Sequence, residues 1–326
     1  MECHEDRAAG RILTMKSFLS CDWGTSSFRL RRVELRDRNV LEEVTSDQGT
    51  AVTFQNWLAS GQPEEQRESF YKNVLWQAIQ NLNELPSSGT PLIVSGMASS
   101  TVGIISLPYQ HFPFAWDPAQ LIVRKIDADK EFGFPIHLVS GLRTKTDIMR
   151  GEETILLGCD LPKVGQSILI FPGTHSKHVR VENGIAVDFK TYTTGEVFNL
   201  LVERSLLSNS VKIGEDIESF NRGIIAAKTE NLLHSIFMVR TRHLLEGTSP
   251  ISNYQYLSGL LIGSELIELV KTSCSIIVVS EEPLLKLYLH ALEVLDMKQR
   301  VNSLSARQAF INGQCELAAM LATSIQ

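Results

Sequence analysis

Residues 18–30 constrain the fold of this chain more than any other segment. An apolar run stops at Asp22, the turn Gly-Thr-Ser-Ser follows, and a second, alternating run begins at Phe28. This pattern predicts a strand, a turn and a strand. The backbone N–H groups and hydroxyls of Gly24, Thr25 and Ser26 suit a phosphate, and Asp22 is an oxygen ligand for the Mg²⁺ of a nucleotide. Taken alone, the motif is explained equally well by an ordinary tight hairpin.

A second segment of the same design lies about 150 residues further on. The apolar residues 168–171 run into Pro172-Gly173-Thr174-His175-Ser176-Lys177. Two halves that each open with strand, Gly-Thr turn and strand indicate an ancient duplication. We expect two such turns, facing each other across a cleft, to hold a triphosphate from both sides. His175 is expected to hydrogen-bond phosphate or the turn backbone.

Length and composition favour two globular lobes. The chain has 326 residues, 43% hydrophobic and 21% charged, too many for one compact core. Its net charge of -6 and lack of a Lys/Arg run argue against nucleic acid or an anionic membrane as a partner. The 5 scattered cysteines form no CxxC pair and indicate the reducing cytoplasm. No run approaches the ~20 apolar residues that span a bilayer.

Strands that alternate with helices predict an α/β protein with mixed sheets. Residues 1–16 lack a signal-peptide h-region and are expected to form a frayed or disordered extension. Residues 17–162 form the predicted N-terminal lobe, and residues 163–326 form a C-terminal lobe that becomes mostly helical after Gly195.

Local patterns predict individual elements within this scheme. After a polar loop at residues 61–67, apolar residues from Phe70 to Leu82 at spacings of three and four predict a helix. Residues 151–161 predict another helix, with acidic Glu152 and Glu153 in its first turn. Asn183-Gly184 predicts a two-residue hairpin. In the helix predicted at 253–270, Gly259 and Gly263 share one face and would admit another backbone.

Asp147 is a candidate catalytic base because it lies just before a predicted helix and the boundary between the lobes. A carboxylate there could accept the proton of a substrate hydroxyl that attacks a γ-phosphoryl group. The position alone favours a simpler role, in which Asp147 caps the following helix.

Other polar residues leave two interpretations each. Arg150 either pairs with Glu153 or holds a substrate carboxylate bidentately. Residues 96–103, with Met97, Ser99 and Ser100, follow a buried strand and either line a sugar pocket or begin a helix. His175 and His178 have no third ligand in sight, which argues against a metal site. The chain lacks the GxGxxG, GxxxxGK[ST], HExxH and GxSxG motifs.

With these elements assembled, the chain resembles the 2-dehydro-3-deoxygalactonokinase family of the hexokinase/actin-like superfamily. The resemblance extends from about residue 18 to at least 270, and its Met-Arg-Gly-Glu-Glu and Pro-Gly-Thr-His-Ser-Lys blocks are long and specific. The matching stretches are residues 22–29, 95–100, 147–154, 171–177 and 256–265.

The resemblance implies two actin/hexokinase-like (ribonuclease H-like) lobes with a cleft between them. It implies ATP- and Mg²⁺-dependent phosphorylation of the 6-hydroxyl of 2-dehydro-3-deoxy-D-galactonate. Asp147 matches the catalytic base of these kinases, which reverses the preference for a cap. Asp22 would orient Mg²⁺, and Gly24, Thr25, Ser26, Gly173, Thr174 and His175 would bind nucleotide phosphates. The implied substrate residues are Ser27, Met97, Ser99, Ser100 and Arg150. The implied partners are the sugar acid and ATP, and a homodimer is compatible with the sequence.

Some positions depart from the family pattern. Ser99 stands where the family usually has glycine, and Ile104 where it often has tryptophan, both near the expected substrate side. Residues 280–283 replace a glycine-containing turn, and Ser305-Ala306 replaces Gly-Asp, both on the expected adenine side. Two alternatives therefore stay open: a same-fold kinase for another sugar acid or polyol, and a non-catalytic nucleotide or sugar sensor.

Overall fold

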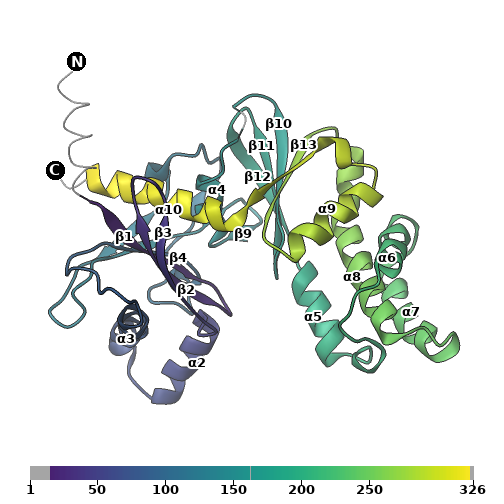
Figure 1. Ribbon diagram of the computed structural model, residues 1–326, viewed down its shortest axis with the longest axis horizontal. Helices are drawn as coiled ribbons and strands as arrows, with labels where there is room; N and C mark the ends of the chain where they lie inside the picture. Colours follow the sequence, from purple (N-terminus) through teal and green to yellow (C-terminus); the bar gives the residue numbers. More distant parts are fainter. Residues whose placement is uncertain (1–14, 162, 324–326) are drawn as a thin grey trace. The chain divides into compact units, whose positions relative to one another are not determined.

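The computed structural model describes residues 15–161 and 163–323, which form two compact units (Figure 1). Unit 1 contains residues 15–161 and 307–323, and unit 2 contains residues 163–306. The predicted N-terminal extension, residues 1–16, lies outside the described residues except for Met15 and Lys16. The Lys16 carbonyl accepts a hydrogen bond from Leu35 at 3.0 Å, immediately before the first strand.

Unit 1 is built on a six-stranded sheet with the order β3-β2-β1-β4-β7-β6. The first three strands form an antiparallel meander, β4 and β7 run parallel to β1, and β6 is antiparallel to β7. The bounds are β1 Ser17–Trp23, β2 Phe28–Glu34, β3 Val40–Ser46, β4 Leu92–Gly96, β6 Val123–Ile126 and β7 Ile136–Val139. The predicted strand, turn and strand at residues 18–30 are confirmed.

The central strand β4 is buried at every position, as expected of a short apolar run covered on both faces. One face of the six-stranded sheet packs on helix α3, where Leu75 and Ile79 share a hydrophobic core with Cys21 of β1 and Leu30 of β2. A small three-stranded sheet, β5-β8-β9, completes the unit. The remaining elements of unit 1 are α2 Thr50–Ser60, η1 Glu64–Gln66, α3 Arg67–Gln80, η2 Met97–Ser99, β5 Gln110–His111, η3 Pro118–Gln120, β8 Leu142–Arg143, β9 Ile148–Met149, α4 Glu152–Leu157 and α10 Ala306–Thr323.

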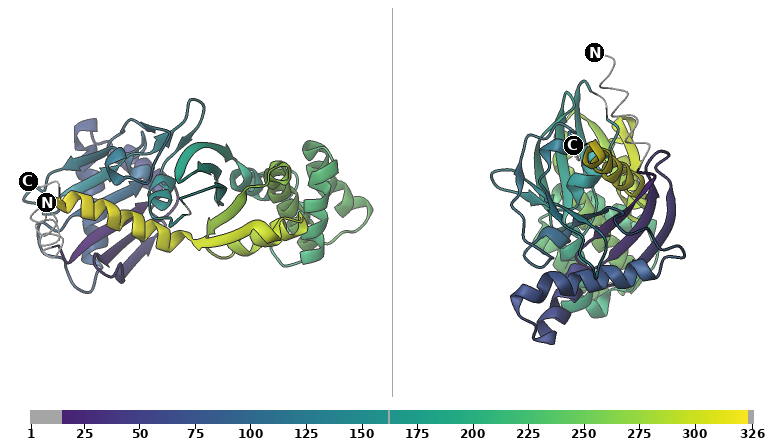
Figure 2. Two further views of the ribbon diagram at one scale, coloured as in Figure 1. Left: turned by 90° about the horizontal axis from the view of Figure 1, so that it is seen from above. Right: turned by 90° about the vertical axis from the view of Figure 1, so that its left-hand side faces the viewer.

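The last helix, α10, belongs to unit 1, which corrects the predicted C-terminal lobe of residues 163–326. Figure 2 shows α10 in yellow alongside β1 in both views. The buried Gln314 amide donates to the carbonyls of Cys21 and Ile93, at 3.3 and 3.4 Å. A Cβ at Gly313 would lie 1.9 Å from the Thr154 carbonyl oxygen, so only glycine permits this contact between α10 and α4.

Unit 2 repeats the plan with a five-stranded sheet of the order β12-β11-β10-β13-β14. Again three antiparallel strands are followed by two that run parallel to the first. The bounds are β10 Gln166–Phe171, β11 Ser176–Glu182, β12 Ile185–Tyr192, β13 Ser275–Ser280 and β14 Val301–Ser305. Both units therefore combine a mixed sheet with helices, so the predicted α/β fold class with mixed sheets is confirmed.

Helices cover one face of the unit 2 sheet, where Phe220 and Leu266 pack on Ile168 and Ile170. Gly259 and Gly263 of α8 allow the close approach that the sequence predicts, because a Cβ at Gly259 would lie 2.0 Å from the Phe220 carbonyl oxygen of α6. The helices are α5 Thr194–Arg204, η4 Ser208–Ser210, α6 Ile217–Thr229, α7 Leu232–Leu245, α8 Pro250–Leu266, η5 Ile267–Lys271, α9 Leu284–Val294 and η6 Lys298–Arg300.

Candidate functional site

The first turn, residues 24–27, joins β1 to β2 in unit 1. The Gly24 N–H donates to the Ser27 carbonyl at 2.9 Å, which closes the turn and leaves Thr25 and Ser26 exposed. Parallel pairing aligns Trp23 at the end of β1 with Gly96 at the end of β4. The turn therefore lies at the carboxyl edge of the sheet, where ligands of α/β proteins commonly bind.

The first turn rests on the beginning of helix α2. Thr50 and Ala51 donate their N–H groups to the carbonyls of Gly24 and Thr25 at 2.9 and 3.0 Å. A Cβ at Gly49, the residue before α2, would lie 2.3 Å from the Thr25 carbonyl oxygen. Glycine at position 49 therefore lets the helix support the turn from behind.

Asp22 lies beside the first turn and is the cross-strand partner of Arg29. Arg29 Nη1 is 3.0 Å from Asp22 Oδ2, and the two side chains are 43% and 25% exposed. Among the described residues, no group of three or more His, Cys, Asp or Glu side chains could hold a metal ion.

The segment after β4 forms η2 and is tied to Arg150. Arg150 Nη1 donates to the Ser99 carbonyl at 2.6 Å and to the Ser99 hydroxyl, and Nη2 donates to the Leu107 carbonyl at 3.2 Å. The guanidinium also lies 4.2 Å from the ring centre of Tyr109. Arg150 thus fastens two loops together, and the predicted alternative of an ion pair with Glu153 on one helix face is replaced by these contacts.

The serines of this segment are buried. Ser99 has no exposed surface, and Ser100 donates its hydroxyl to the Met97 carbonyl at 2.7 Å. Met97 is half-buried. The structure therefore brings Ser99 and Arg150 into contact, and both serines make hydrogen bonds within the protein.

Asp147 lies in the tight connection between β8 and β9. The Asp147 N–H donates to the Thr144 hydroxyl at 3.0 Å, and its carboxylate accepts from the N–H of Ile148 at 2.8 Å. Helix α4 begins five residues later, with Gly151 as its N-cap. The interpretation of Asp147 as a helix cap is therefore wrong, and its half-buried carboxylate belongs to a turn instead.

Glu152 and Glu153 lie in the first turn of α4, as predicted, but Glu153 is not an exposed charge at the helix terminus. It is fully buried, and its carboxyl group accepts from the N–H of Gly151 at 2.7 Å. Burial, reinforced by the neighbouring charge of Glu152, raises the pKa of Glu153 to about 8. Thr154 donates to the Ser95 hydroxyl at 2.8 Å, which joins this acidic start of α4 to the end of β4.

The second turn, residues 172–175, joins β10 to β11 in unit 2. Thr174 and His175 are exposed, and no atom lies within 4 Å of a Cβ built at Gly173. His175 Nε2 is 2.8 Å from Glu196 Oε2. The buried Lys177 donates its Nζ to the His175 carbonyl at 3.0 Å. Thr174 and His175 of the second turn are therefore accessible, and the buried Lys177 contacts the backbone of the turn.

Helix α5 supports the second turn as α2 supports the first. The Glu196 N–H donates to the Thr174 carbonyl at 3.0 Å. A Cβ at Gly195 would lie 2.5 Å from the Gly173 carbonyl oxygen. In both units, a glycine at the beginning of the next helix packs against a Gly-Thr turn.

Glu265 of α8 was not among the residues that the sequence singled out. Its side chain is 2% exposed and accepts hydrogen bonds from Ser176, His178, Thr194 and Tyr288. Burial would raise the pKa of Glu265, but the hydrogen bonds, led by that of His178, lower it below its usual value. A carboxylate on an otherwise apolar helix face was the available sequence signal.

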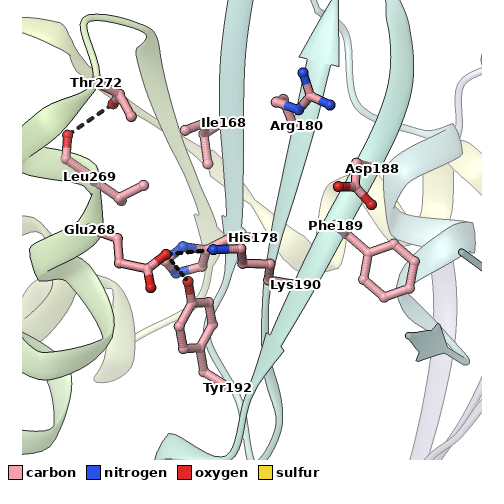
Figure 3. Close-up of a pocket in the computed structure, with 10 residues that line it drawn as sticks. All are labelled: Ile168, His178, Arg180, Asp188, Phe189, Lys190, Tyr192, Glu268, Leu269 and Thr272. Carbon is pink, nitrogen blue, oxygen red and sulfur yellow. Dashed lines mark hydrogen bonds and ion pairs between the residues drawn. The ribbon is translucent and has the colours of Figure 1, made fainter. Parts of the chain in front are cut away.

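Two hollows lie away from the predicted site residues. In unit 2, a cavity of about 170 Å³ lies between the sheet and η5, where Lys190 Nζ is 2.6 Å from Glu268 Oε2 (Figure 3). Tyr192 donates to the same carboxylate at 3.3 Å, and His178 forms part of the wall. In unit 1, a hollow of about 320 Å³ lies among polar side chains of α2 and α3.

The chain resembles known sugar-acid kinases over most of its length. The family model described as 2-keto-3-deoxy-galactonokinase matches residues 22–317. A probable 2-dehydro-3-deoxygalactonokinase of Rhizobium meliloti is 30% identical over 271 residues, which cover 78% of this chain and 81% of that protein. The 2-dehydro-3-deoxygalactonokinase of Escherichia coli is 33% identical over 184 residues, 54% of this chain and 60% of that protein.

A solved structure shows the same relationship in three dimensions. A protein of Sinorhizobium meliloti, assigned as a 2-dehydro-3-deoxygalactonokinase, superposes with a TM-score of 0.74 and 27% identity over 95% of this chain and 97% of that one. Among the helices of the described residues, none has the length and apolar character needed to cross a membrane. The family model and the relative from Rhizobium meliloti show that the chain belongs to the 2-keto-3-deoxy-galactonokinase family and is a carbohydrate kinase.

Proposed function

We propose that this chain transfers the γ-phosphoryl group of ATP to the 6-hydroxyl of 2-dehydro-3-deoxy-D-galactonate. The observation that carries the proposal is the turn that is built twice. In each unit, a Gly-Thr turn at a strand end is supported by the backbone of the following helix. The exposed residues of such turns, Thr25 and Ser26 in unit 1 and Thr174 and His175 in unit 2, offer hydroxyl, imidazole and backbone groups that suit phosphate oxygens. We assign phosphate binding to Gly24, Thr25 and Ser26 in the first turn, and to Gly173, Thr174 and His175 in the second turn.

Asp147 is the proposed general base. The substrate hydroxyl oxygen would form a bond to the γ-phosphorus while the bond from that phosphorus to the leaving oxygen of ADP breaks. The hydroxyl proton would pass to the Asp147 carboxylate. Two hydrogen bonds and the burial of the side chain support this role: the bonds with the Thr144 hydroxyl and the Ile148 N–H fix the turn, and the residue is half-buried rather than enclosed.

Asp22 is the proposed protein ligand, direct or through water, for Mg²⁺. This ion is commonly held by one or two carboxylates together with substrate phosphates and water. A single, partly exposed carboxylate at the edge of the first turn fits that donor set, and Arg29 keeps it in place. When bound, Mg²⁺ would neutralise charge on the phosphate oxygens.

We assign substrate contacts to Ser27 and Met97, whose side chains are partly accessible. Ser99, Ser100 and Arg150 would act together to shape this region, because Arg150 connects the Ser99 and Leu107 backbones. The Ser99 hydroxyl gives Arg150 a contact that a glycine could not provide. This observation favours a second candidate, a kinase of the same fold with a related sugar acid as its substrate.

A coupled assay of ADP release over a panel of sugar acids and polyols tests the proposal. We expect 2-dehydro-3-deoxy-D-galactonate to give the highest kcat/KM, and phosphorus NMR to locate the product phosphate on C6. A higher kcat/KM for another sugar acid would replace the substrate and keep the kinase. Nucleotide binding without ADP release for any acceptor would instead support a sensor.

A further inference from the structure

We infer that Glu265 is a positioning residue that holds the second turn and helix α5 in register for phosphate binding. This inference rests on the proposed function of the second turn. Glu265 lies in the last turn of α8, on the face of the helix that packs against the unit 2 sheet. The carboxylate does not lie in the exposed turn itself, so its role is distinct from that of a residue that touches the ligand.

The Glu265 carboxylate accepts hydrogen bonds from the residue that follows the second turn and from the helix that supports this turn. Ser176, the first residue after the turn, donates to Oε1 at 2.6 Å. Thr194, the first residue of α5, donates to Oε2. The backbone of Gly195 in α5 also packs against Gly173 in the second turn. The turn and α5 therefore contact each other directly, and both are joined to Glu265. One buried group therefore fixes the relative position of the turn and of the helix that supports it.

Two further donors fill the remaining capacity of the carboxylate. His178 Nε2 lies 2.8 Å from Oε1, and the Tyr288 hydroxyl of α9 donates to Oε2 at 2.7 Å. His178 points at Glu265 from the strand that follows the turn, and Tyr288 comes from the helix layer. A carboxylate that accepts four hydrogen bonds is stabilised as an anion even though it is buried. Its geometry is therefore rigid, as positioning requires.

The four donors differ in a way that makes the inference testable. Ser176 and Thr194 connect Glu265 to the second turn and to α5, whereas Tyr288 connects the same carboxylate to α9 and also interacts with the Ser176 hydroxyl. Each can lose its hydroxyl with little change of shape, as Ser176→Ala, Thr194→Val and Tyr288→Phe. Tyr288→Phe is the matched control, because it removes one hydrogen bond from the same carboxylate without disconnecting the turn.

Three measurements test the role of Glu265. They are calorimetry of ADP binding in the presence of Mg²⁺, amide hydrogen exchange of residues 173–175 in the free protein, and thermal melting. For Ser176→Ala and Thr194→Val we expect faster exchange of the turn and about tenfold weaker ADP binding, the effect of about one lost interaction. For Tyr288→Phe we expect a lower Tm but unchanged exchange of the turn and ADP affinity within about twofold of wild type.

The positioning role is overturned if Ser176→Ala and Thr194→Val leave both exchange and ADP affinity unchanged, or if Tyr288→Phe alters them equally. The exchange measurement needs no ligand and no turnover. A lack of kinase activity in the wild-type protein would therefore contradict the proposed function. The exchange data would still test the positioning role of Glu265. The reverse result, normal turnover with unchanged exchange and binding in all three variants, would sink only the role of Glu265.

Discussion

The first turn and the second turn share a backbone plan and differ in where they keep their charge. Both are closed by strands, and both rest on a helix that begins with a close-packed glycine, Gly49 or Gly195. The first turn has its carboxylate at the front, on Asp22, paired with an arginine across the strand. The second turn has its carboxylate beneath it, on Glu265, where four hydrogen bonds enclose it.

This difference indicates how one topology can divide two tasks. A partly exposed carboxylate is available to a hydrated cation, whereas a buried one can only organise its neighbours. We therefore expect substitutions at the first turn to change cation dependence and substitutions at the second turn to change nucleotide affinity. The following predictions test this division, beginning with the largest expected effect.

Asp147 belongs to unit 1, as the first turn does, and its substitution is expected to have the largest effect. Asp147→Asn removes the proton acceptor while it keeps the shape of the side chain, so kcat should fall by about 10²–10⁴-fold. Coupled ADP-release kinetics would measure the loss, and calorimetry should show normal ADP binding. Asp127→Asn, at an exposed loop aspartate of the same unit, is the control. A near-wild-type kcat in Asp147→Asn would show that Asp147 is not the general base.

Gly173 and Gly195 separate ligand binding from support in the second turn. A Cβ at Gly173 meets nothing within 4 Å, so Gly173→Ala should fold normally and raise the KM for ATP about tenfold by occupying the space assigned to phosphate. A Cβ at Gly195 would lie 2.5 Å from the Gly173 carbonyl oxygen, so Gly195→Ala should cost about 1–3 kcal/mol of stability.

Denaturant unfolding and ATP kinetics on both variants would check these expectations. Gly49→Ala is the counterpart of Gly195→Ala in unit 1, because its Cβ would lie 2.3 Å from the Thr25 carbonyl oxygen. Wild-type KM for ATP in Gly173→Ala would argue that no phosphate approaches the second turn.

The two buried glutamates predict opposite effects of pH on stability. Burial raises the pKa of Glu153 to about 8, so the folded protein keeps the proton that the unfolded chain loses above about pH 4.5. Its contribution to stability should therefore fall as pH rises from about 4.5 to 8, by up to ~1.4 kcal/mol per pH unit. Glu265 has a lowered pKa, so its contribution is present above the usual pKa and is lost as pH falls through the lower folded value.

Urea unfolding at several pH values, for wild type and Glu153→Gln, measures the first effect. Glutamine keeps the shape and cannot ionise, so Glu153→Gln should be more stable than wild type at pH 8 and should lose that advantage toward pH 4.5. Parallel stability curves for the two proteins between these pH values would contradict the neutral, buried Glu153.

Arg29 gives the smallest expected effect. Its pair with Asp22 is partly exposed, so Arg29→Gln should change the free energy of unfolding by less than about 1 kcal/mol. The same change should alter the Mg²⁺ concentration needed for half-maximal kcat, because Asp22 loses its partner. Magnesium titrations of wild type and Arg29→Gln would show the shift. An unchanged titration would assign Mg²⁺ to other ligands.

Local patterns were sufficient to predict the strands around both turns and the hairpin at Asn183-Gly184. Asn183 and Gly184 both have positive φ, as this turn requires. The sequence did not predict helix α2 because its N-cap residue, Gly49, has no side chain to cap the helix, and only Thr50, Thr53 and Trp57 of the helix are buried. The apolar pattern of α2 is therefore short. Gly49, which lets α2 pack against the first turn, is a residue type typical of loops.

Long-range contacts account for the rest of what the sequence did not predict. The return of α10 to unit 1 depends on Gln314, which contacts β1 from about 290 positions away in the chain. The buried state of Glu153 likewise depends on packing, since an acidic residue in a first helical turn is ordinarily exposed. The separation of Asp147 from the start of α4 was set by the short strand β9, which is only Ile148–Met149.

Amide hydrogen exchange with and without Mg²⁺-ATP tests the central claim most directly, because it reports on both turns of one sample. If both turns bind phosphate, residues 24–27 and residues 173–175 should each exchange more slowly when the nucleotide is present, while residues 183–184, at the hairpin of the same sheet, should not change. Saturating nucleotide that protects neither turn, or only one of them, would contradict the account.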